Sequence, residues 1–243
     1  MNKIPNGYIA YKGASRFDGA PILLLITAIK TPSSNRKTTG MLQTWIMRED
    51  MHPQEALKTG ADISVCGNCP LRPEEGKERV CYVNPMSFGQ VYKAYAAGQY
   101  PVLEDFSKLA YKNIAIRLGS YGDPAAVPLD IWDKVVSKMI YHTGYTRQWA
   151  NPDNAEYKKY LMASCFTAEE QQKAKALGWR TFRVKSKDDL IITKTEVICP
   201  SSAAANYKKI CLTCRLCDGG HSKANDIVVD VHGNGLKYFA KLS

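Results

Sequence analysis

A regular alternation of helical and strand segments after about residue 86 constrains the fold most strongly. Helices are expected where apolar residues recur at helical spacing, and strands where short apolar or β-branched runs end in turns. The expected helices cover residues 87–97, 103–112, 129–139, 153–159 and 168–177, and the expected strands cover 114–118, 140–146, 160–165, 180–184 and 226–231. Strands that recur with a helix between them predict parallel βαβ units. We therefore expect an α/β fold with a partial or complete (β/α) barrel-like parallel sheet, or alternatively an open doubly wound sheet.

The first 85 residues have a different pattern, in which apolar runs are separated by breaks rich in Gly, Pro and Ser. Strands are expected over 8–11, 22–29 and 42–47, and a short helix over 53–58. The segment predicts a β-rich N-terminal extension that carries the first cysteines. We expect residues 1–85 and the βα-repeat part, residues 86–243, to pack as one compact unit.

Hydropathy and charge bear on where the protein acts. The longest apolar run, Pro21 to Ile29, is shorter than the ~20 residues that cross a bilayer, and the first residues lack a signal-peptide pattern. We therefore expect a cytoplasmic protein with no membrane partner, in which cysteines serve metals rather than disulfides. Lys and Arg outnumber Asp and Glu by 33 to 23, a net charge of +10 that favours nucleic acid or small anions as partners.

Most of the cysteines fall into two groups. The first group is Cys66, Cys69 and Cys81, the second is Cys199, Cys211, Cys214 and Cys217, and only Cys165 lies outside them. Thiolates that lie close together repel one another and need a metal to hold them. Both groups are therefore candidate metal-ligand sets. The alternative for a single member such as Cys66 is a small buried apolar residue.

The second group favours an iron–sulfur cluster. Its Cys-x2-Cys-x2-Cys run, together with a distant Cys-Pro, resembles the pattern that binds [4Fe–4S] in bacterial ferredoxins. Zinc is the alternative, although zinc sites favour paired Cys-x2-Cys motifs or Cys with His. The first group supplies three thiolates, so its fourth ligand would be Cys165, His52 or a cysteine of the second group, or one iron would stay open to substrate. The spacing leaves open whether there is one centre or two.

Polar side chains follow several of the expected strands. They are Arg117, with Ser120 and Asp123 in the next turn, then Tyr145 and Arg147, and then Arg183. The carboxyl ends of parallel strands are the usual ligand site of α/β folds. We therefore predict that Arg117, Asp123, Tyr145, Arg147 and Arg183 bind an anionic ligand such as a nucleotide. The alternative is that the arginines pair with carboxylates or carbonyls of the fold.

Tyrosines stand next to lysines at Tyr92-Lys93, Tyr111-Lys112, Tyr157-Lys158 and Tyr207-Lys208. A basic surface with aromatic side chains can stack on single-stranded nucleic acid. Amphipathic helices give the same pattern when their tyrosines cover the edge of a core, and this is the interpretation we favour.

Several longer motifs resemble a family of phage-encoded proteins of the "gene product 88" type, which are uncharacterised or described as iron–sulfur-binding. The motifs are Gln43-Thr44-Trp45-Ile46, Cys66-Gly67-Asn68-Cys69-Pro70-Leu71-Arg72, the segment from Arg117 to Pro124, Thr143-Gly144-Tyr145-Thr146, the segment from Gly178 to Val184, and the segment from Cys199 to Cys217. The resemblance covers most of the chain. It implies phage origin, action in the cytoplasm of a bacterial host and a cysteine-ligated cluster, but no particular reaction.

These features predict a phage-type [4Fe–4S] protein with a redox or structural role, or an enzyme that acts on an anionic ligand. One alternative is a zinc-stapled basic protein that binds nucleic acid. Another is an enzyme similar to the radical S-adenosylmethionine family, which combines a (β/α) barrel with a three-cysteine cluster, although the chain lacks the usual Cys-x3-Cys-x2-Cys loop of that family.

Overall fold

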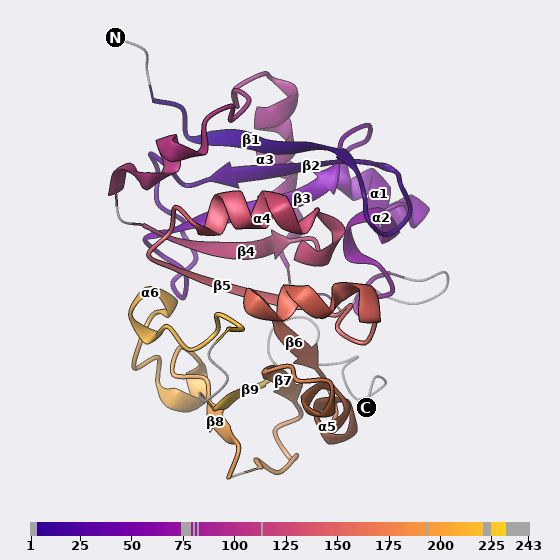
Figure 1. The fold of residues 1–243 in the computed structure, drawn as a ribbon, viewed down its shortest axis with the longest axis vertical. Coiled ribbons are helices and arrows are strands. Elements are labelled where there is room, and N and C mark those ends of the chain that lie inside the picture. The colour runs from indigo at the N-terminus through magenta and orange to yellow at the C-terminus, as the bar shows by residue number, and fades with distance from the viewer. Residues whose placement is uncertain are drawn as a thin grey trace.

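The fold is built on a nine-stranded sheet with the order β1-β2-β3-β4-β5-β6-β7-β9-β8 (Figure 1). The computed structural model describes residues 4–73, 79, 81, 83–112, 114–192, 194–220 and 225–231. Within these residues the sheet is twisted and open, and its edge strands β1 and β8 each have one neighbour. No helix in the described part of the chain is long and apolar enough to span a membrane.

The first three strands form an antiparallel meander of β1 (Gly7–Ala14), β2 (Pro21–Thr27) and β3 (Met41–Arg48). β2 lies between the other two strands, and every residue of it after Pro21 is buried. A strand that is buried on both faces needs a continuous apolar run, and residues 22–26 provide one.

From β3 onward every strand pairing is parallel. The strands are β4 (Ala115–Tyr121), β5 (Tyr141–Thr146), β6 (Met162–Cys165), β7 (Thr181–Lys185), β8 (Glu196–Ile198) and β9 (Asp226–Asp230). Because β3 pairs with β4, the β-rich N-terminal segment and the βα part share one sheet. The boundary expected at residues 85 and 86 therefore falls between two neighbouring strands.

Capping residues set where the helices begin and end. The α-helices are α1 (Pro53–Thr59), α2 (Ile63–Cys66), α3 (Pro85–Ala96), α4 (Leu129–Val136), α5 (Ala168–Ala176) and α6 (Cys211–Cys214), and the 3-10 helices are η1 (Phe106–Lys112), η2 (Pro124–Ala126), η3 (Pro152–Lys159) and η4 (Ala203–Ala205). The Thr167 hydroxyl accepts a hydrogen bond from the Glu170 N–H at the start of α5. Gly60, with a φ of 75°, ends α1 in the left-handed conformation that glycine adopts easily.

The two faces of the sheet are covered differently. On the face where α4 lies, Trp132 of α4 and Leu118 of β4 belong to the main apolar core (Figure 1). On the opposite face a smaller apolar cluster consists of Leu71, Phe166, Val184 and Val229. Because successive side chains of a strand point to opposite faces, alternate residues of each strand lie on this other face, called here the second face of the sheet. The candidate site lies there.

Most of the expected elements are confirmed, as are the α/β class and the mostly parallel sheet. A barrel is not confirmed. The helices expected over 103–112 and 153–159 are 3-10 helices over 106–112 and 152–159. The sequence did not predict β8, α2 or α6, because each spans three or four residues, which is too short for a recognisable period.

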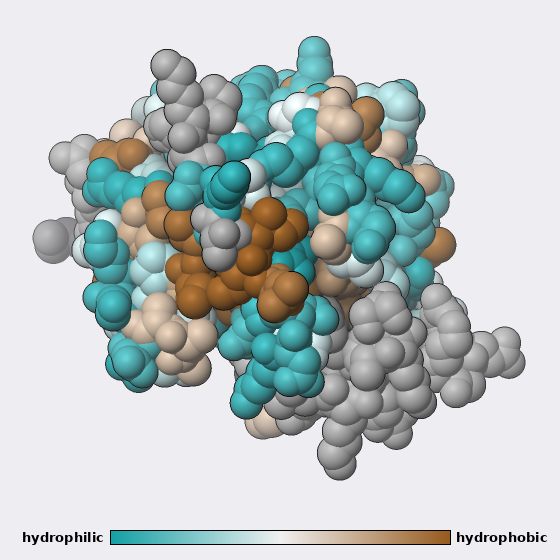
Figure 2. Space-filling view, turned by 90° about the horizontal axis from the view of Figure 1, so that it is seen from below, coloured by the Kyte–Doolittle hydropathy of each residue, from teal (hydrophilic) through white to brown (hydrophobic). Residues whose placement is uncertain are grey.

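The edge strand β8 lies beside exposed apolar side chains. Leu190, which precedes it, is 87% exposed, and Ile198 at its end is also exposed. Figure 2 shows a hydrophobic area on the side of the molecule at which β8 lies in Figure 1.

A buried ion pair joins β7 to the start of β8. Two nitrogens of the Arg183 guanidinium donate to the two carboxylate oxygens of Glu196, each at 2.7 Å, and both side chains are buried. Burial raises the pKa of Glu196, but the hydrogen bonds from Arg183 and the Ile192 N–H outweigh this effect and leave the pKa below its usual value. Glu196 is therefore ionised near neutral pH and holds β8 in place.

Glu196→Gln should lower the free energy of unfolding by about 3–5 kcal/mol, because it leaves the Arg183 charge buried without a partner. The matched control Asp130→Asn breaks the exposed pair with Lys134 and should cost less than about 1 kcal/mol. Urea unfolding at several pH values measures both. The pKa of Glu196 is lower in the folded than in the unfolded protein. The stabilisation by the ion pair is therefore fully present above the unfolded pKa of about 4.3, and it is lost as the pH falls through the lower pKa of the folded state. Equal losses in the two variants at neutral pH would contradict this account.

Candidate metal centre and ligand cavity

The four cysteines of the second group line one small cavity that no described cysteine of the first group lines, although Cys69, Cys81 and Cys199 pack against the same apolar cluster. All eight cysteines are free thiols. The charges that raise the pKa values of Cys66 and Cys69 include those of thiols in the first group only, and those acting on Cys199, Cys214 and Cys217 include those of thiols in the second group only. The arrangement favours two separate sites over one shared site.

The second group, called here the four-thiol group, is assembled from two segments. Cys199 follows β8 directly, and its N–H donates to the carbonyl of Val228 at 2.8 Å. Cys211 and Cys214 are the first and last residues of α6, at a spacing that places two side chains on one face of a helix. Arg215 then adopts a left-handed conformation with a φ of 57°, and this turn leads the chain to Cys217.

Cys217 lines one small cavity together with the other three members of its group, Cys199, Cys211 and Cys214. Burial raises the pKa of Cys217 most strongly, and a hydrogen bond with Tyr145 acts in the opposite direction. Charges on the other three members, Cys199, Cys211 and Cys214, raise it further. Burial also raises the pKa of Cys199, and the positive charge of Lys37 lowers it in part.

Backbone contacts fix Cys217 against β5. Its N–H donates to the Tyr141 hydroxyl at 2.9 Å, and its carbonyl accepts from the Gly144 N–H at 3.2 Å. The next carbonyl, that of Asp218, lies 2.7 Å from Nε2 of His142. The Asp218 carboxylate pairs with the buried Arg180 at 3.1 Å.

The first group, called here the three-thiol group, lies at the end of α2 and in the loop after it. Burial raises the pKa of Cys66 and raises that of Cys69 to about 12. The Cys81 N–H donates to the carbonyl of Leu71 at 3.0 Å, which returns the chain to the same place. Arg72 supports the segment through its ion pair with the buried Asp62 at 2.8 Å.

The two residues considered outside the groups, His52 and Cys165, have other contacts in the fold, although the buried Nε2 of His52 has no hydrogen-bond partner among the described residues. The His52 Nδ1 accepts the Gln54 N–H at the start of α1, and its ring packs edge-on against Tyr92. Burial raises the pKa of Cys165 to about 12, and the charges acting on it are those of arginines and carboxylates, led by Arg147. Both residues are engaged elsewhere in the fold.

The donor chemistry of the four-thiol group fits a metal cluster. In the described ranges, no three or more His, Cys, Asp or Glu side chains are arranged so that they could hold a metal ion. Sulfur is nevertheless the only donor type that its four members offer, and soft thiolate ligands select iron–sulfur clusters, zinc or Cu(I). The spacing within α6 and the turn at Arg215 bring three of them from one short segment.

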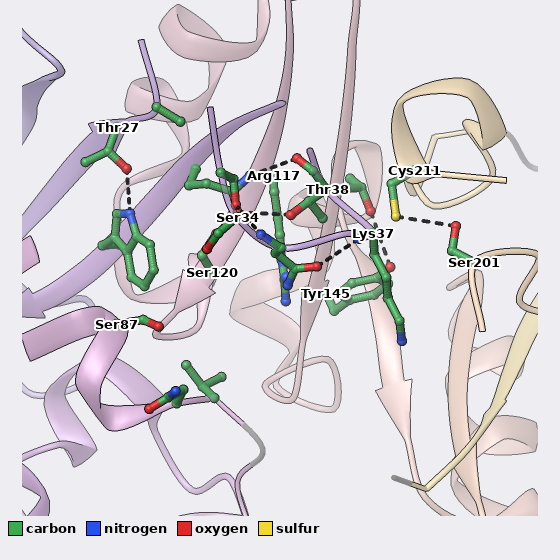
Figure 3. A pocket seen from close by; sticks show the side chains of 18 of the residues that line it. Thr27, Ser34, Lys37, Thr38, Ser87, Arg117, Ser120, Tyr145, Ser201 and Cys211 are labelled. Carbon is green, nitrogen blue, oxygen red and sulfur yellow. Dashed lines mark hydrogen bonds between the residues drawn. The ribbon is translucent and has the colours of Figure 1, made fainter. Parts of the chain in front are cut away.

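A cavity of about 660 Å³ lies on the second face of the sheet, next to the four-thiol group (Figure 3). Its polar end is formed by the loop after β2 and by Gln43, Arg117, Ser120 and Thr143. Its apolar end is formed by Leu71, Phe166, Phe182, Val184, Val229 and Val231. Cys199 and Cys211 also line it, so the four-thiol group borders the cavity.

Three neighbouring strands present a row of polar side chains to this cavity. Gln43 of β3, Arg117 of β4 and Thr143 of β5 are aligned in register. The Gln43 amide is occupied, because it donates to the Met41 carbonyl at 3.0 Å and accepts from the Ser120 hydroxyl at 2.8 Å. The Arg117 guanidinium, in contrast, makes no hydrogen bond or ion pair with any described residue.

Of the predicted ligand-binding residues, Arg117 and Tyr145 line the cavity, whereas Asp123, Arg147 and Arg183 do not. Burial raises the pKa of Asp123 to about 6. Its carboxylate accepts hydrogen bonds from the Thr146 hydroxyl at 3.0 Å and the Arg147 N–H at 2.7 Å. The Arg147 guanidinium pairs with Glu170 at 2.7 Å, and Arg183 pairs with Glu196. These three residues are engaged with protein groups, as in the alternative interpretation.

Several cavity residues were missed at the level of sequence. Trp45 lines the cavity and donates its indole N–H to the Thr27 hydroxyl at 2.8 Å. Phe182 was also missed, and its ring centroid lies 4.4 Å from that of the predicted residue Tyr145. The alternation along β3, which puts Gln43 and Trp45 on one face, is the signal that could have indicated them.

The tyrosines next to lysines occupy different environments. Tyr157 is buried in the main core, and the partly buried Tyr92 packs against that core. Tyr207 is exposed and carries Arg36 over its ring at 4.4 Å. The side chains of Tyr111 and Lys112 lie outside what the structure describes.

In comparisons with known proteins, no family model, no curated protein and no solved structure matches this chain. The resemblance to the phage family therefore stays a prediction.

Gly219→Ala should displace the segment that carries Cys217. Gly219 has a φ of 80°, and an added Cβ would lie 2.5 Å from the backbone nitrogen of Leu161. We expect a loss of at least about 2 kcal/mol in the free energy of unfolding, from the left-handed backbone and the overlap together. Gly98→Ala is the control, since its φ is 68° but nothing lies within 4 Å of the added Cβ. It should cost only about 1 kcal/mol, and urea unfolding compares the two. Equal costs would contradict the close packing of this segment.

Proposed function

We propose that the protein binds a [4Fe–4S] cluster through Cys199, Cys211, Cys214 and Cys217, and that it acts in electron transfer to or from a molecule in the adjoining cavity. The observation that carries the proposal is that four thiols, from two segments, line one small cavity together. Without a metal, four thiolates at one place would repel one another.

The chain holds these thiols in a way that suits a resident cofactor. Cys217 is fixed by hydrogen bonds to Tyr141 and Gly144, and α6 spaces Cys211 from Cys214. When bound, a cluster of this type supplies one-electron redox chemistry, and its potential depends on hydrogen bonds to sulfur and on solvent exposure. Tyr145, whose hydroxyl interacts with Cys217, is placed to influence that potential.

A redox role is favoured over a purely structural one because the four-thiol group forms part of a cavity wall. Cys199 and Cys211 line the same cavity as Arg117. A cofactor with a purely structural role, which only joins two segments of the chain, would not need to border a cavity large enough for a small molecule. Action in the cytoplasm of a phage-infected bacterium remains part of the proposal.

Anaerobically purified protein should be brown and carry about four iron atoms and four acid-labile sulfides at this site. Cys214→Ala should abolish most of this iron, because one of four ligands is lost. Cys165→Ala is the matched control, since Cys165 is buried but outside both groups, and it should keep the iron. Iron and sulfide analysis with absorbance near 400 nm measures each variant.

Two further results would decide between related proposals. Colourless protein with stoichiometric zinc, lost in Cys214→Ala, would replace the cluster by the zinc alternative. Iron that survives in Cys214→Ala but disappears in Cys66→Ala would place the metal at the three-thiol group instead. Free thiols at all positions in oxygen-protected protein would refute the proposal.

A further inference from the structure

The charge of the cavity wall is one-sided. Its described lining residues include the cations Lys37 and Arg117 but no Asp or Glu. Both cations lie at the polar end, where Ser34, Thr38 and Ser120 add hydroxyl groups (Figure 3). Cations and hydroxyl donors at one end of a cavity favour an anion over a cation or a neutral sugar.

Arg117 differs from several arginines that lie in or next to other strands. Arg147, Arg180 and Arg183 each pair with a carboxylate, at 2.7, 3.1 and 2.7 Å respectively. Arg117, in the middle of the row formed by three strands, pairs with none in the described part of the chain. A half-buried cation without a counter-charge is costly, and a guanidinium matches the two oxygens of a carboxylate or phosphate. The geometry therefore leaves a place for the anionic group of a ligand.

The opposite end of the cavity requires an apolar body. Phe166, Phe182, Val184 and Val229 form a continuous apolar wall there. A cavity of about 660 Å³ is in the range that holds a drug-sized molecule. Inorganic phosphate would pair with Arg117 but would leave this wall in contact with water.

We propose that the cavity binds an organic anion, with its carboxylate or phosphate group on Arg117 and a ring or hydrocarbon body against the apolar wall. Arg117 is then a binding residue, and the β2–β3 loop supplies further donors to the same group. The proposal extends the proposed function by naming the class of molecule that the cavity takes. It stands on the sheet residues, so it can be tested whether or not the four-thiol group holds iron.

The test uses two fluorescent probes with the same rings. Anilinonaphthalene sulfonate carries an anion, and N-phenylnaphthylamine is its neutral counterpart. Each is titrated into the folded protein, and the dissociation constant and stoichiometry are measured. We expect saturable binding of one molecule of the anionic probe per chain.

Arg117→Gln should weaken the anionic probe about tenfold or more, the equivalent of a charge-assisted hydrogen bond, and leave the neutral probe unchanged. Lys173→Gln, on the exposed face of α5, removes the same charge outside the cavity and should change neither probe. Val229→Phe narrows the apolar end and should weaken both. Unchanged binding of the anionic probe in Arg117→Gln, or of both probes in Val229→Phe, would overturn the proposal.

Competition identifies the anionic group. Naphthyl phosphate and naphthoate share one ring system, so displacement of the bound probe by one and not the other distinguishes phosphate from carboxylate. Displacement by either supports the proposal. Displacement by neither, or equal displacement by the uncharged naphthol, would show that Arg117 does not select an anion.

Discussion

The candidate site depends on two residues, Cys217 and Asp218, whose main-chain groups form hydrogen bonds with residues of β5. β6 pairs with β5 only from Tyr145 onward, so the first half of β5 has unpaired backbone groups on that side. Buried backbone groups must find partners, and the Cys217 carbonyl accepts the Gly144 N–H there. The short strand β6 thus creates the place that Cys217 occupies, and the position of the four-thiol group follows from the geometry of the sheet.

The sequence predicted the elements of the fold well but the site only in part. Long segments such as β2 and α4 have enough residues to show a period, and they lie where they were expected. Arg117 and Arg183 illustrate the limit, because both are arginines in short apolar strands. Their roles differ because Glu196 meets Arg183 in space, and such pairings over distance leave no local signal. The same holds for the separation of the two cysteine groups, which spacing left open.

The arrangement of charge explains why a strongly basic chain has a polar cavity rather than a basic groove. Many of the cations are neutralised within the fold, as in the pairs of Arg72 with Asp62 and of Arg147 with Glu170. The cavity keeps at Arg117 a cation that pairs with no carboxylate among the described residues. The net charge of +10 is therefore a poor guide to the ligand, and the local count of carboxylates around the cavity is a better one.

One hydrogen bond links the proposed metal site to the proposed anion site. The Cys211 N–H donates to the carbonyl of Lys37 at 2.8 Å, which joins the start of α6 to the loop that closes the polar end of the cavity. A molecule that draws this loop inward also moves a sulfur donor of the metal site. Thermodynamic linkage makes the coupling reciprocal. If the organic anion changes the affinity for the cofactor by some factor, the cofactor must change the affinity for the anion by the same factor. The proposed anion site and the proposed metal site thus lie one hydrogen bond apart along the chain, and either ligand would report on the occupancy of the other site.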